Sequence, residues 1–178
     1  MSAGLLVAGI GNILLSDDGF GSEVARCLAE VQMPDGVRVA DFGIRGVHLA
    51  FELLQGYDAL ILVDAMERGE EAGTITLLRP DNGDTAGSVA LDAHDMDPAA
   101  VLDMVRRLGG QVGSVVVVGC EPGSLEEGIG LTDPVAEAVA PAVAVVRELV
   151  TSYLDPDGGG RPWTASTHIA RDPDARER

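Results

Sequence analysis

The chain has 178 residues, 46% of them hydrophobic, with 29 acidic residues against 12 basic ones and a net charge of −17. This length suits one domain with its own core, and the acidic excess repels nucleic acid and anionic membranes. No window has the 18 or more apolar residues of a membrane span and the N-terminus lacks the features of a signal peptide, so we expect a cytoplasmic protein with neither nucleic acid nor membrane as partner.

Apolar runs alternate with segments of helical period along the chain. Strands are predicted at 5–11, 37–43, 59–65, 74–78 and 114–122, and helices at 21–31, 46–54, 97–108 and 132–153. The connection from the third strand to the fourth is too short for a helical crossover, so the fourth strand should be antiparallel. Pro141 should kink or break the last helix.

Two stretches depart from this alternation. Residues 80–97 form a long polar connection that contains His94. Residues 155–178 are rich in Gly, Pro, Asp and Arg, and we expect a disordered tail after a domain that spans 1–154. The tail holds five acids and four arginines, which leaves 29 − 5 = 24 acids and 12 − 4 = 8 bases in the domain, so the negative charge belongs to the folded body.

The turn Gly9-Ile10-Gly11 after the first strand raises the possibility of a nucleotide site. The dinucleotide fingerprint needs a third glycine where Leu14 stands, and Asp17 and Asp18 would repel a pyrophosphate at the helix N-terminus. A P-loop needs a lysine, and this chain has none. Acidic residues that stabilise the positive end of a helix explain one aspartate better than two.

The ends of the strands suggest a different ligand. Asp18 lies just beyond the first strand and Asp64 ends the third, at the edge of a parallel sheet where ligands bind. His94 could add an imidazole, which gives two carboxylates and one histidine for Zn, Ni or Fe. From spacing alone, helix-capping and surface acids remain an alternative to this metal site.

Other reactive residues have weaker contexts. His48 falls within a predicted amphipathic helix, His168 in the predicted tail, and Ser124 lacks the surroundings of a hydrolase nucleophile. Cys27 and Cys120 have apolar neighbours and no C-x-x-C spacing, so both are predicted to be core thiols in a reducing compartment.

Taken together, the segments GIGNILLSDDGFG, DFGIRG, LILVDA, DAHDMD and GCEPGSLEEGIGLTDPV resemble the hydrogenase maturation proteases over about residues 4–150. The resemblance implies a three-layer α/β/α sandwich of the phosphorylase/hydrolase-like type, with a five-stranded, mostly parallel sheet and one antiparallel strand. It also implies an endopeptidase that removes the C-terminal extension of a [NiFe] hydrogenase large-subunit precursor after nickel insertion.

The family's metal-contacting and catalytic residues fall on Asp18, Asp64 and His94. The first position is Glu in some members and Asp here. Nickel is expected to arrive with the substrate and serve as the recognition element, so no tightly bound cofactor is expected. Asp17 would cap the helix or orient its neighbour.

Three alternatives stay open at this point. Asp18 and Asp64 could form an aspartyl protease dyad that needs no metal. The chain could instead be a metal-sensing module that binds the precursor without cutting it, or a nucleotide-binding regulator.

Overall fold

The computed structural model describes residues 4–80, 98–155 and 168–169. Its strands are β1 (Gly4–Ile10), β2 (Val37–Gly43), β3 (Tyr57–Ala65), β4 (Ile75–Leu78), β5 (Ser114–Cys120) and β6 (His168–Ile169). Its helices are α1 (Phe20–Ala29), α2 (Gly46–Leu53), α3 (Pro98–Arg107) and α4 (Asp133–Leu154), and a 3-10 helix, η1 (Ser16–Gly19), precedes α1. All five predicted strands and all four predicted helices are therefore present, and η1 and the two-residue strand β6 are additions that the sequence pattern did not predict.

The strands form one sheet in the order β2-β1-β3-β5-β4-β6. The strands β2, β1, β3 and β5 are mutually parallel, whereas β4 pairs antiparallel with β5, as its short connection predicted. The chain passes from β1 to β2 on one side and returns to β3 on the other side of β1, so the strand order switches between β1 and β3.

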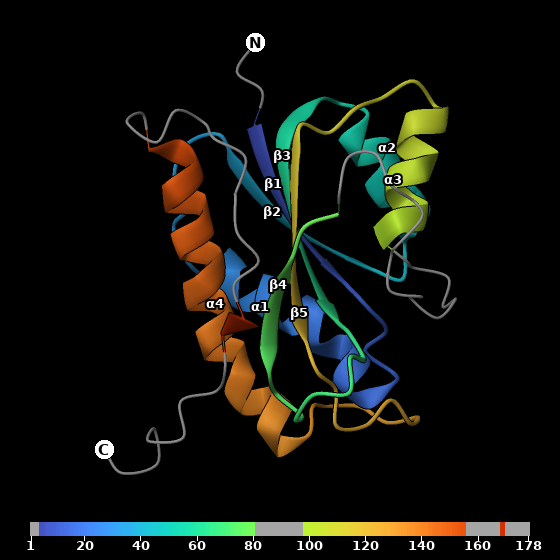
Figure 1. The fold of residues 1–178 in the computed structure, drawn as a ribbon, viewed down its shortest axis with the longest axis vertical. Helices are drawn as coiled ribbons and strands as arrows, with labels where there is room; N and C mark the ends of the chain where they lie inside the picture. Colours follow the sequence, from blue (N-terminus) through green and yellow to red (C-terminus); the bar gives the residue numbers. More distant parts are fainter. Residues whose placement is uncertain (1–3, 81–97, 156–167, 170–178) are drawn as a thin grey trace.

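Alternate residues of the central strands point to opposite faces, and each face has its own core. Leu5 and Val7 of β1 pack with the buried side chains of α1 and α4, whereas Leu6 and Ala8 pack with those of α2 and α3. Figure 1 shows α4 on one side of the sheet and the pair α2 and α3 on the other. The expected three-layer α/β/α sandwich is confirmed.

The last helix shows no break at Pro141, where the sequence predicted a kink or a break. α4 runs from Asp133 to Leu154 through Pro141 without a break, because the exposed proline costs the helix one N–H donor while the buried valines on its other face hold it to the sheet. Among the described helices, none combines the length and apolarity needed to cross a bilayer.

The predicted tail is only partly described. Within 155–178 the structure describes Asp155 and the two residues of β6, which pair antiparallel with Ile75 and Thr76 of β4. The boundary after residue 154 stays a prediction, and it coincides with the end of α4.

Candidate active site

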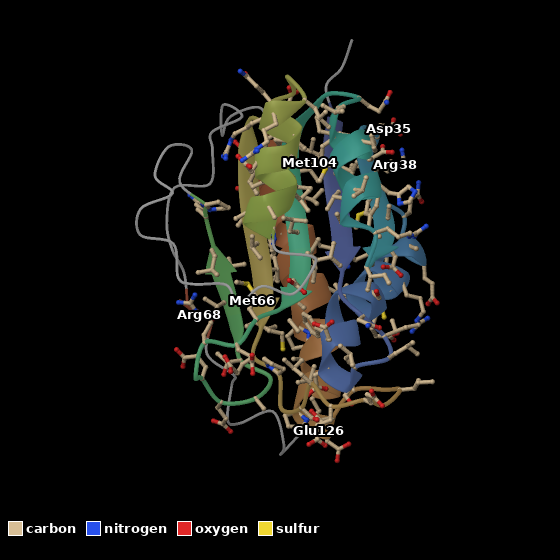
Figure 2. The ribbon with its side chains drawn as sticks, turned by 90° about the vertical axis from the view of Figure 1, so that its right-hand side faces the viewer. Asp35, Arg38, Met66, Arg68, Met104 and Glu126 are labelled. Carbon is tan, nitrogen blue, oxygen red and sulfur yellow. The ribbon has the colours of Figure 1, made fainter. Side chains whose placement is uncertain are left out.

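The carboxyl ends of β1, β3 and β5 meet at one end of the sheet. β3 pairs in parallel with β1 on one side and with β5 on the other, and Asp64, near the end of β3, lies opposite Gly119 of β5. Asp64 is half-buried. Figure 2 shows Met66, which follows β3, and Arg68 and Glu126 toward this end of the molecule, with Asp35 and Arg38 toward the other.

Asp18 reaches the same end from β1. It belongs to η1, which contacts β3, and its half-buried carboxylate accepts a hydrogen bond of 2.7 Å from the backbone N–H of Asn12. Since β1 and β3 are neighbours where the strand order switches, and η1 contacts β3, Asp18 and Asp64 lie at the same end of the sheet.

The glycines of the turn allow this close packing. Gly11 has a φ of +129°, and a Cβ added to it would lie 1.9 Å from the backbone oxygen of Asp18. A Cβ on Gly9 would lie 2.3 Å from the backbone oxygen of Gly21 in α1. The two glycines therefore bring η1 and α1 against the end of β1, which supports a turn shaped by backbone packing and not by a phosphate.

Asp17 has a role that the sequence did not predict in full. It is completely buried, and its carboxylate accepts hydrogen bonds from the backbone N–H groups of Gly123 and Ser124 and from both the N–H and the hydroxyl of Thr132. The N-cap of α1 is Gly19, which has no side chain to form a cap. Helix capping by Asp17 is therefore wrong, because its side chain binds the segment after β5 instead.

Glu121 is a further acid at this end, and sequence reasoning missed it. It follows β5 directly, is 8% exposed, and accepts hydrogen bonds from the N–H groups of Arg68 at 2.7 Å and Gly69 at 3.3 Å. It thus fixes the turn that leaves β3 after Asp64. The available signal was an acid at the end of an apolar run, the same pattern that identified Asp64.

The third predicted ligand, His94, lies outside the described residues. Within the described ranges, no group of three or more His, Cys, Asp or Glu side chains could hold a metal ion. The structure therefore places Asp18, in η1, and Asp64, near the end of β3, at the same end of the sheet, and the three-residue metal set stays a prediction.

The two thiols differ. Cys120 is fully buried at the end of β5, and burial, followed by the negative charges of Asp17 and Glu121, raises its pKa to about 12. Cys27 is partly buried and packs against the core between α1 and α4, at the edge of a groove between these two helices, so the prediction of a core thiol holds only in part. His48 is exposed on α2, as expected for a surface residue of an amphipathic helix.

With this geometry in place, known proteins identify the family. The family model of the hydrogenase maturation proteases matches residues 22–149. The chain belongs to the hydrogenase maturation protease family. It is 33% identical over 144 residues to the hydrogenase 2 maturation protease of Escherichia coli, covering 80% of this chain and 87% of that protein. It is 34% identical over 147 residues to the hydrogenase expression/formation protein HupM of Azotobacter chroococcum, covering 81% and 70%.

Solved structures of this family share the fold. The hydrogenase maturating endopeptidase HybD of Escherichia coli superimposes with a TM-score of 0.73 at 30% identity, covering 85% of this chain and 94% of that one. The hydrogenase 2 maturation peptidase of a Thaumarchaeota archaeon gives a TM-score of 0.65 at 28% identity, covering 83% and 97%. The chain is therefore a peptidase of the hydrogenase maturation type, and the resemblance found in its motifs is confirmed.

Proposed function

We propose that this protein removes the C-terminal extension of a [NiFe] hydrogenase large-subunit precursor after nickel has been inserted, and that it recognises the nickel carried by that substrate. Family membership supports the class of substrate. The observation that supports the proposal is the adjacency of β1 and β3, because it puts Asp64 and the turn that holds Asp18 at the same end of the sheet, at the switch in strand order.

In this proposal, Asp18, Asp64 and His94 bind the nickel of the precursor. A cation there polarises the scissile carbonyl or lowers the pKa of the attacking water, and one carboxylate takes the proton from that water and passes it to the leaving amine. The water oxygen bonds to the carbonyl carbon as the C–N bond breaks. Since the ion comes with the substrate, the free protein needs no tightly bound metal.

The aspartyl dyad is the second candidate, because the same two carboxylates belong to η1 and β3, which contact each other. A chelator separates the two: cleavage that needs substrate nickel stops when the ion is removed, whereas a dyad continues. A cytoplasmic location is part of the proposal, since Cys27 and Cys120 are both free thiols.

The test is cleavage of purified precursor, nickel-loaded and nickel-free, followed by mass spectrometry. We expect shortening of the nickel-loaded form only. Equal cleavage of both forms would refute the proposal that the protein recognises nickel. Binding of the precursor without cleavage would favour a metal-sensing module.

Site variants test the residues. Asp64→Asn, Asp18→Asn and His94→Ala should each lower cleavage by about 100-fold or more, because each removes a ligand or a proton-transfer group. The fold should survive Asp64→Asn, since the substitution keeps the shape of the side chain and removes one of the negative charges at this end of the sheet.

Asp58→Asn is the matched control, because Asp58 is an exposed carboxylate at the opposite end of the same strand, β3. It should cleave at the wild-type rate. Wild-type cleavage by folded Asp64→Asn would refute the shared site.

A further inference from the structure

We infer that Asp17 is a positioning residue that holds Asp18 in place by clamping η1 to the segment 121–132. The inference rests on the proposed function for the role it gives Asp18, but the clamp itself is a property of the described residues.

The contacts of Asp17 are unusually complete for a carboxylate. Oδ2 accepts the N–H of Gly123 at 2.7 Å, the N–H of Ser124 at 2.9 Å and the hydroxyl of Thr132 at 2.7 Å. Oδ1 accepts the N–H of Thr132 at 2.6 Å. One side chain thus joins η1 to both the beginning and the end of the segment that connects β5 to α4.

Backbone hydrogen bonds extend this junction. The N–H of Asp17 donates to the carbonyl of Ser124 at 3.1 Å, and the N–H of Ser16 donates to the carbonyl of Gly128 at 2.8 Å. Gly128 in turn donates to Leu14 at 2.9 Å. The segments 14–17 and 124–128 therefore pack as one unit beside Asp18.

The charge explains why this unit has one arrangement. A buried carboxylate is expensive unless hydrogen bonds or a cation satisfy it, and among the ion pairs of the described residues none involves Asp17. Its partners are neutral donors. Any shift of η1 would leave the buried charge and its donors unsatisfied, so Asp17 holds η1 at one position.

Asp18 follows Asp17 in the same turn, and its carboxylate accepts a hydrogen bond of 2.7 Å from the N–H of Asn12. The Asn12 amide therefore reports whether the carboxylate of Asp18 stays in place. Asparagine cannot replace Asp17, because both carboxylate oxygens accept hydrogen bonds. In asparagine the NH2 group would take the place of one of these oxygens, and it would then face another donor.

The test uses the full chain with Asp17→Asn and two readouts. Exchange of the Asn12 amide, followed by NMR, should accelerate about tenfold or more relative to the slowest amides of β1. Cleavage of the precursor should fall by about 10- to 100-fold at a temperature where the variant is folded, as is typical when a group that orients a reactive residue is lost.

Val150→Ala is the stability control, because Val150 is buried near the far end of α4, away from the clamp. It should lower the melting temperature yet keep the Asn12 exchange and the cleavage rate of the wild type. If Asp17→Asn behaves like Val150→Ala in both readouts, Asp17 only stabilises the fold and the inference is overturned.

Thr132→Val covers the case in which Asp17→Asn does not fold. It removes one hydroxyl donor and keeps the N–H, so a smaller acceleration at Asn12 is expected, and Thr132→Ser should restore slow exchange. Unchanged exchange in Thr132→Val would also overturn the inference. If the clamp responds as expected while Asp18→Asn still cleaves, the clamp stands and the proposed catalytic site fails.

Discussion

Cys120 shows how the environment of a single residue decides its chemistry. Burial raises its pKa from the ordinary 9.0 to about 12, so the thiol stays protonated at neutral pH and is a poor nucleophile. Cys120→Ser should therefore retain precursor cleavage. Loss of cleavage by a folded Cys120→Ser protein would point to a thiol mechanism.

The same shift predicts a pH dependence. The unfolded thiol ionises near pH 9 and the folded one near 12, so the unfolded state releases its proton first and wild-type stability falls as the pH rises through this interval. The Cys120→Ser variant has no thiol at this position, so its stability should not fall for this reason. Melting temperatures from about pH 8 to about pH 11 should thus decline less steeply in the variant, and parallel declines would contradict the assignment.

Candidate site residues could be proposed from the sequence where a local pattern marked them. Asp18 and Asp64 follow apolar runs, and an acidic residue after an apolar run can be recognised in the sequence alone. The partners of Asp17 are not, because Gly123, Ser124 and Thr132 lie 106, 107 and 115 residues away. No periodicity encodes such a contact, and helix capping was the nearest local explanation.

At the scale of the element, packing of α4 against the sheet outweighs the low helix propensity of Pro141. Pro141 lies inside the helix and is exposed, so it offers no N–H donor and no core contact. Pro141→Ala should stabilise the protein by about 1 to 3 kcal/mol, since proline costs about 3 kcal/mol in a helix interior. Urea unfolding measures the change, and a destabilised variant would mean that the proline ring fits a bend that α4 requires.

The strands and helices themselves were largely readable from the sequence. β2 has the predicted bounds, and β5 and α4 begin where expected, because apolar runs and a proline near the helix start mark them. β3 begins two residues earlier than predicted, at Tyr57. The 3-10 helix η1 escaped prediction because four residues are too few to show a period, and the pairing of β6 with β4 joins segments about 90 residues apart in sequence.

At the scale of the whole molecule, the net charge of −17 sets the response to salt. Ion pairs such as Arg26 with Glu23 and Arg107 with Asp103 join exposed side chains and contribute little. Screening should relieve the repulsion among the remaining acids, so raising NaCl from about 0.02 M to about 0.3 M should raise the melting temperature by a few degrees. KCl should act equally, and a melting temperature that falls with salt would show that attractive pairs dominate.

The clamp at Asp17 also sets an order of assembly during synthesis. The carboxylate must wait for Thr132, which is made 115 residues later. At about 5 to 20 residues per second, this wait lasts about 6 to 23 s. The growing chain can form β1, α1 and β3 during that time, but the end of the sheet that carries Asp18 is completed only after β5 and the first turn of α4 have been translated. A nascent chain that ends before Thr132 therefore lacks a partner that fixes η1, however many of its strands have already formed.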